Sequence, residues 1–373
     1  MTTHPSATEF ARFFLPGPTA VRPEVLQALA RQPIGHRGAA ATALLAGVEA
    51  PLREVFGTER PVYVATCSAT GLMEAGVRCG VRRRALCLVN GAFSERFRDL
   101  VTACGRHAAE YAVPWGEAHD ADEVERRLLA DPGCDALTVV HSETSTGVLN
   151  PLREIAAAVR SVEERTGREI LLLVDGVTSV GGARVRTDEW RLDWLLTGSQ
   201  KALALPPGLA FGAASRGLLE RAETLPERGS YFDLLEWDRY AANHQTPTTP
   251  AVNLLYALEE QLRYIAAEGI GARTARHTAM AARCAEWVEE TGARWGLGVL
   301  APPERRSPTV TALTVSGEGA APTLVRALAE RGYTVGSGYG RLKGETFRIG
   351  HMGDHTVEEL DDLLDALTEV LGA

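Results

Sequence analysis

The alternation of apolar, strand-like runs with helical patterns constrains the fold of this chain most strongly. Runs at 61–66, 85–89, 109–113, 136–140 and 170–175 are each followed by a turn or by a segment with helical spacing of apolar residues. Parallel strands separated by helices need crossover connections, which favours a mostly parallel, doubly wound sheet. We therefore expect an α/β fold in which this sheet forms a large domain over residues 1–250.

The pattern changes after the turn-rich segment 243–250. Further elements are expected at about 251–268, 271–291, 309–315, 321–331, 346–350 and from Val357 onward. The segment 309–315 alternates polar and apolar residues, as a half-exposed strand does. These elements predict a smaller C-terminal α+β domain over residues 251–373. The N-terminal segment, about residues 1–20, is expected to pack on that domain or on a partner.

Composition narrows the class of protein. The chain has 373 residues and 45% hydrophobic content, enough for a large core, and its net charge of −9 argues against a nucleic-acid partner. No run approaches 18 apolar residues and the first residues lack a signal pattern, so we expect a cytoplasmic protein without membrane contact. The cysteines form no CxxC pair and predict reduced thiols and no metal site; they are residues 67, 79, 87, 104, 134 and 284.

Two residues carry the chemistry that this fold allows. Asp175 ends a run predicted to be a buried strand, and ligands bind at the carboxyl ends of such strands. Lys201 lies between an apolar run and the segment ALALPPG, where a dry environment favours a neutral, nucleophilic amine. The pair suits pyridoxal phosphate (PLP), with the lysine as a Schiff base and the carboxylate beside the pyridine nitrogen. Taken singly, Asp175 could instead cap a helix and Lys201 could be a surface lysine.

Four further segments fit the same site. The loop 66–71 joins a strand to a helix, where backbone N–H groups stabilise a phosphate. Phe93 follows the next strand and could stack on a planar cofactor or belong to the core. The segment 141–147 is rich in hydroxyls. Arg348 lies inside an apolar strand and needs a partner there, either a substrate carboxylate or an internal ion pair.

Three motifs, HSETSTGVLNPL, LLLVDGVTSVGG and TGSQKALALPPG, occur in this order. The chain resembles the class V, fold-type I PLP-dependent aminotransferases, especially the alanine–glyoxylate, serine–glyoxylate and serine–pyruvate branch. The resemblance extends from Leu15 to Gly353. It implies a ping-pong transfer of an amino group from alanine or serine to glyoxylate or pyruvate, and a homodimer with shared active sites.

The resemblance also implies roles for individual residues. Lys201 would form the Schiff base and act as acid and base, Asp175 would pair with the pyridinium nitrogen, and Arg348 would bind the substrate α-carboxylate. The other cofactor contacts implied are Ser68, Ala69, Thr70, Phe93, Thr144, Val177, Gln200 and, from the neighbouring subunit, Thr249. The loop 67–70 departs from the family's usual glycine-rich or histidine-containing form.

Particular residues favour or disfavour other functions. The pair His36-Arg37 is similar to one in phosphoserine aminotransferases that contacts the substrate phosphate, although such a pair can also brace a dimer. Phosphoserine is therefore the second candidate substrate. A desulfurase-like lyase needs a cysteine on a C-terminal loop, but the last cysteine, Cys284, lies in a helical pattern. A nucleotide-binding Rossmann protein is disfavoured because no GxGxxG follows the first strand and no Walker loop is present.

Overall fold

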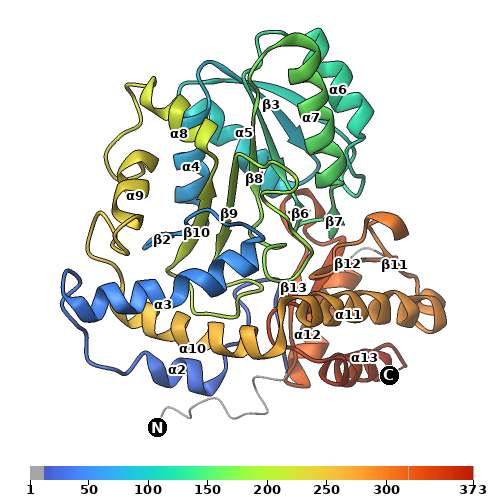
Figure 1. The fold of residues 1–373 in the computed structure, drawn as a ribbon. Helices are drawn as coiled ribbons and strands as arrows, with labels where there is room; N and C mark the ends of the chain where they lie inside the picture. The colour runs from blue at the N-terminus through green and yellow to red at the C-terminus, as the bar shows by residue number, and fades with distance from the viewer. Residues whose placement is uncertain (1–11, 318, 373) are drawn as a thin grey trace.

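In the computed structural model, which describes residues 12–317 and 319–372, a seven-stranded sheet forms the centre of the larger unit (Figure 1). Strand β10 is antiparallel to both of its neighbours, whereas the other described pairs are parallel. The strands in spatial order are β2 (Tyr63–Ala65), β10 (Ala210–Ala214), β9 (Trp194–Gly198), β8 (Leu171–Asp175), β5 (Ala136–Val140), β3 (Arg84–Val89) and β4 (His107–Ala112). The predicted α/β fold with a mostly parallel sheet is confirmed.

Helices cover both faces of this sheet because alternate side chains of each strand point to opposite sides. In β8, Leu172 and Val174 join one buried cluster, and Leu171 and Leu173 join the other. The first cluster includes α2 (Pro23–Ala28), α3 (Ala39–Phe56), α6 (Ala121–Ala130), α7 (Leu152–Thr166) and α10 (Val252–Glu268). The second includes α4 (Ala69–Gly80), α5 (Ala92–Ala103), α8 (Arg216–Glu223) and α9 (Leu234–Ala241).

A five-stranded sheet forms the smaller unit at the lower right of Figure 1. Its strands in spatial order are β1 (Phe13–Phe14), β13 (Thr334–Ser337), β14 (Thr346–Gly350), β12 (Val310–Val315) and β11 (Leu297–Val299). Its core also includes residues of α11 (Ile270–Glu290), α12 (Ala320–Glu330) and α13 (Val357–Gly372). Strand β1 pairs with β13, so the start of the described chain adds an edge strand to the C-terminal sheet.

The domain boundary at residue 250 stays a prediction, because α10, which follows it, packs in the core of the larger sheet. The expected packing of residues 1–20 lies partly outside the described residues. Short elements complete the described chain: β6 (Ser142–Glu143), β7 (Val148–Leu149) and 3-10 turns at Gly292–Trp295, Pro303–Arg305 and Gly340–Leu342. Across residues 12–317 and 319–372, no helix has the length and apolar character needed to span a membrane.

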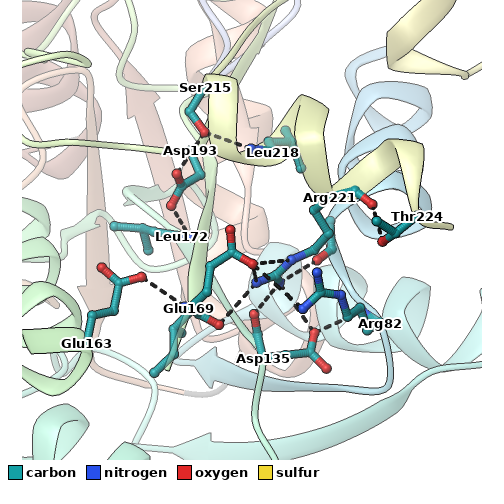
Figure 2. Close-up of polar contacts among 12 residues, drawn as sticks. Arg82, Asp135, Glu163, Glu169, Leu172, Asp193, Ser215, Leu218, Arg221 and Thr224 are labelled. Atoms are coloured by element: carbon teal, nitrogen blue, oxygen red, sulfur yellow. Dashed lines mark hydrogen bonds and ion pairs between the residues drawn. The ribbon is translucent and has the colours of Figure 1, made fainter. Parts of the chain in front are cut away.

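A buried arginine braces the amino ends of the strands (Figure 2). The side chain of Arg221 on α8 is fully buried and donates hydrogen bonds to the carbonyl oxygens of Gly80 (3.0 Å), Asp135 and Glu169 (3.1 Å). It also forms an ion pair with the Glu169 carboxylate. Asp135 and Glu169 lead into β5 and β8, so one guanidinium links both strands to the helix layer at the edge opposite their carboxyl ends.

We expect Arg221→Met to destabilise the protein by about 3 kcal/mol, because buried carbonyl acceptors would lose their donor. The measurement is urea unfolding followed by circular dichroism. Arg216→Met is the matched control on the same helix: its side chain is 92% exposed and pairs with Glu220, so we expect a change below about 0.5 kcal/mol. Equal effects of the two substitutions would contradict the bracing role.

Candidate active site

The carboxyl ends of the parallel strands bring the predicted residues to one edge of the larger sheet. Asp175 is the last residue of β8, and Lys201 follows the end of β9 by three positions. Phe93 is the second residue of α5, just after β3, and the Lys201 Nζ lies 6.0 Å from the centre of its ring. Thr144 follows β6. Residues far apart in the sequence therefore meet where an α/β sheet binds ligands.

Lys201 is buried, with 8% of its surface exposed. Its Nζ donates a hydrogen bond to the carbonyl oxygen of Pro16 in the N-terminal segment. Gly17 has φ +106°, and a Cβ on it would lie 2.4 Å from this Nζ, so a glycine is needed there. Burial and, next, the positive charge of Arg348 lower the pKa of Lys201 to about 8. The amine is therefore far easier to deprotonate than that of a solvated lysine.

Asp175 is a buried carboxylate that makes no ion pair with the described residues. Its Oδ1 accepts a hydrogen bond of 2.7 Å from the backbone N–H of Val177. Burial raises the pKa of Asp175 to about 7, and the attraction of Lys201 only partly opposes this shift. A cationic group placed against the carboxylate would restore its charge.

Arg348 on β14 reaches the same site from the smaller sheet. It is 7% exposed, and its guanidinium donates to the carbonyl oxygens of Ser337 (3.0 Å) and Thr144 (3.2 Å). Burial lowers the pKa of Arg348 to about 10. The internal ion pair considered from the sequence is not formed with any carboxylate of residues 12–317 and 319–372, so the guanidinium retains donors for a ligand.

Glu143, which sequence reasoning missed, holds together two segments of the site, the start of α5 and the loop after β6. Its fully buried carboxylate accepts hydrogen bonds from the backbone N–H and hydroxyl of Ser94 and from those of Ser145. Ser94 is in the first turn of α5, beside Phe93, so Glu143 ties the start of α5 to the loop after β6. The acidic residue within the hydroxyl-rich HSETS segment was the available signal. Thr144 contacts Thr178, hydroxyl to hydroxyl, at 2.5 Å.

The expected phosphate side of the site lies at the start of α4. Ser68 is the exposed N-cap residue, and its hydroxyl makes no capping hydrogen bond. A Cβ on Gly198 would lie 2.7 Å from Oε1 of Gln200 and 3.4 Å from the Cβ of Ala69, so both side chains pack close to Gly198 at the end of β9. Thr70 is half-buried in the same turn of α4. Free N–H groups and hydroxyls there suit an anion.

Val177, also half-buried, follows Asp175 at the edge of the site. Its carbonyl oxygen accepts a hydrogen bond of 3.2 Å from the Thr197 hydroxyl.

His36, Arg37 and Thr249 form a separate group on the surface. The His36 Nε2 lies 3.4 Å from the Thr249 hydroxyl oxygen. Arg37 donates to the carbonyl oxygens of Thr246 (2.7 Å) and Pro247 (2.9 Å). The structure therefore brings these three residues to each other and shows no hydrogen bond or ion pair between them and the described residues around Lys201.

Two further residues that sequence reasoning missed contact the ring of Phe93. The ring of Tyr339 stacks on that of Phe93, with centroids 5.3 Å apart. The guanidinium carbon of Arg96 lies 5.1 Å from the centre of the Phe93 ring, and Arg96 donates a 3.2 Å hydrogen bond to the Tyr339 hydroxyl. Arg96 comes three residues after Phe93 on α5 and hence shares its face, which was a usable signal. Tyr339 follows the short strand β13, which had not been expected.

Residues 97–363 match the family model of the class-V aminotransferases. This chain belongs to the class-V aminotransferase family. It is 33% identical to serine–glyoxylate aminotransferase of Methylorubrum extorquens (91% of this chain, 86% of the relative) and 35% identical to L-aspartate–glyoxylate aminotransferase of Paracoccus denitrificans (92% and 86%). The crystal structure of an alanine–glyoxylate aminotransferase from Nostoc sp. superposes with a TM-score of 0.89 at 31% identity, covering 100% of this chain and 98% of that one.

Membership in the class-V aminotransferases makes the chain a transaminase and implies PLP as its cofactor. The residues of the site fit that group. A buried carboxylate without a cation, a buried amine of lowered pKa and an N-cap serine with a free hydroxyl are the partners that a cationic ring nitrogen, a carbonyl carbon and a phosphate require.

We expect the rate at which PLP becomes covalently bound to the apoprotein to rise about tenfold per pH unit below pH 8 and to level off above it. The lowered pKa of Lys201 means that the neutral, reactive amine accumulates as the pH rises through about 8. The measurement is the growth of visible cofactor absorbance after mixing. In Arg348→Gln, loss of the nearby positive charge should move the midpoint to higher pH. A wild-type midpoint near 10.5, the ordinary value of a lysine, would show that the Lys201 amine is not perturbed by its burial.

Proposed function

We propose that this class-V aminotransferase transfers the amino group of alanine or serine to glyoxylate or pyruvate in a ping-pong cycle. The observation that carries the proposal is the convergence of Lys201, Asp175 and Arg348, all buried and none ion-paired with described residues, at one sheet edge. The names of the serine–glyoxylate and alanine–glyoxylate relatives support these small substrates. We also propose a cytoplasmic location, which fits the acidic composition and the free cysteines.

PLP, when bound, supplies an electron sink for the substrate α-carbon. Lys201 would hold it covalently and Asp175 would face its ring nitrogen. Phe93 would stack on the ring, opposite Val177, and Thr144 would lie near the phenolic oxygen. The phosphate would be bound by groups of the α4 start and the turn after β9, namely Ser68, Ala69, Thr70 and Gln200.

The protein's own groups then divide the work on the substrate. Arg348 binds the α-carboxylate through two parallel hydrogen bonds, which fixes the orientation of the α-carbon. Lys201, no longer bound to the cofactor, accepts the α-proton of the substrate at Nζ as a general base. The same amine then donates the proton as a general acid. Its lowered pKa matches both tasks near neutral pH. The buried setting excludes water from both groups and strengthens their interactions.

A homodimer that shares its active sites explains the placement of the surface group. Thr249 and Arg37 are exposed, and His36 is half-buried beside Thr249. Such polar groups, which make no hydrogen bond or ion pair with Lys201 of the same chain, are suited to complete the site of a second copy, with Thr249 on the neighbour's cofactor phosphate. Phosphoserine is less favoured than alanine or serine, because backbone carbonyls already engage the Arg37 guanidinium.

The chain contains two lysines, which allows a sharp test of the cofactor-binding residue. We expect Lys201→Ala to lose the visible cofactor absorbance that borohydride abolishes and to lose activity by more than about 1000-fold. The exposed second lysine is the control, and Lys343→Ala should keep both properties. Tryptic mapping after borohydride treatment of the wild type should find PLP on the Lys201 peptide. Labelling of Lys343 instead, or full activity of Lys201→Ala, would overturn the proposal.

A second experiment separates the candidate substrates. We expect Arg348→Gln to raise the KM for alanine and for glyoxylate by about 100-fold while cofactor absorbance is retained, because the variant loses a charge-assisted carboxylate contact. Arg37→Ala should leave turnover of alanine and serine within about twofold. Steady-state assays with alanine, serine and phosphoserine as donors are the measurement. Turnover of phosphoserine alone, abolished by Arg37→Ala, would replace alanine and serine with a phosphorylated substrate.

A further inference from the structure

A cavity of about 680 Å³ lies between α7, α11 and the 3-10 turn at Pro303–Arg305. Both helices lie on the right-hand side of the molecule in Figure 1. This volume is within the range of small-molecule sites. The residues that line the cavity come from both the larger and the smaller unit, and none of them belongs to the candidate active site.

The cavity exists because α11 turns a face of small side chains toward it. Thr274, Ala275, Thr278 and Ala282 recur at the spacing of one helix face and leave the space unfilled. The facing wall is more bulky and includes Trp190 from the segment that precedes β9. A continuous helix on one side and packed loops on the other give the cavity firm walls.

The charges around this cavity are predominantly positive. Four arginines line it, Arg153, Arg184, Arg305 and Arg306, and none of them forms an ion pair with a described carboxylate. Most other arginines of the described chain are ion-paired. Two acidic residues, Glu154 and Glu304, also line the cavity, so the lining carries a net positive charge. Guanidinium groups without carboxylate partners are suited to an anionic ligand that presents several acceptor oxygens.

The inner wall is formed by His141 and Trp190. His141 is 3% exposed, and its Nδ1 has no hydrogen-bond partner among the described residues. Its ring packs edge-on against Trp190, with centroids 6.3 Å apart and an interplanar angle of 87°. Trp190 is half-buried, so part of its indole is available to a planar, apolar group.

We propose that this cavity binds a small organic phosphate with a planar apolar part, such as a nucleoside monophosphate. The phosphate would lie among the four arginines, and the planar part would lie against Trp190. The cavity adjoins the active site through the backbone, because the N–H of His141 donates a 2.9 Å hydrogen bond to the Asp175 carbonyl oxygen. The proposal does not depend on which amino acid the enzyme uses.

The test is isothermal titration calorimetry of the PLP-loaded enzyme with AMP, adenosine and inorganic pyrophosphate. We expect AMP to bind at micromolar to submillimolar concentration and more tightly than either adenosine or pyrophosphate. The double variant Arg184→Gln/Arg305→Gln should weaken AMP binding at least tenfold. Arg326→Gln, an exposed arginine on α12 outside the cavity, should leave it unchanged. Trp190→Leu should weaken AMP binding but not pyrophosphate binding.

Several results would overturn the proposal. The proposed site would be rejected if AMP binding were too weak to detect at 1 mM. It would also be rejected if Arg326→Gln weakened AMP binding as much as Arg184→Gln/Arg305→Gln does. If pyrophosphate bound as tightly as AMP, the planar organic part would contribute nothing to binding, and the proposed organic phosphate would be rejected. All variants are first checked for wild-type cofactor absorbance and thermal unfolding, so that a loss of binding is not a loss of fold. If Trp190→Leu fails this check, the Arg184→Gln/Arg305→Gln variant still tests the proposal. Both arginines are solvent-accessible, so we expect their substitution to preserve the fold.

Discussion

The burial of an amine, a carboxylate and a guanidinium at one sheet edge, without ion pairs to balance them, is the constraint on which this structure depends. Removing such groups from water is costly, and each pKa here is shifted toward the neutral form. The buried groups can stay in place only if favourable interactions in the rest of the molecule offset this free-energy cost. The site is thus unfavourable for the protein alone and favourable for a ligand that supplies a cationic nitrogen, a carbonyl carbon and a carboxylate.

The two edges of the larger sheet divide stability and chemistry between them. At the amino edge, Arg221 satisfies three backbone carbonyls and a carboxylate. At the carboxyl edge, Glu143 uses hydrogen bonds to fix the loop and helix start around Phe93, leaving Lys201, Asp175 and Arg348 to a ligand. The parallel direction of the strands other than β10 makes this division possible, because it places their carboxyl ends on the same side.

The alternation of strands and helices could be predicted from the period of the apolar residues. The candidate site residues could be predicted because they follow strands, and a parallel sheet brings such positions to one edge. Asp120, a residue type that favours helix N-caps, accepts a hydrogen bond from the N–H of Glu123 at the start of α6. The strands β1 and β13 could not be predicted, because each is short and their pairing joins residues more than 300 positions apart. Tyr339 was missed for a similar reason, because its stacking on Phe93 joins residues that are far apart in the sequence. Glu143 and Arg96 carried local signals, but the sequence does not show which groups they contact.

The N-terminal segment shows how the two units are joined at the site itself. Phe13 and Phe14 extend the smaller sheet, and a few residues later the Pro16 carbonyl binds the amine of Lys201 in the larger unit. Arg348, on the smaller sheet, in turn binds the Thr144 carbonyl. Arg348, proposed to bind the substrate, and Lys201, proposed as the acid–base group, are therefore held in register by contacts that cross between the units. A displacement of the smaller unit would move Arg348 relative to Lys201, so substrate orientation depends on how the two sheets pack together.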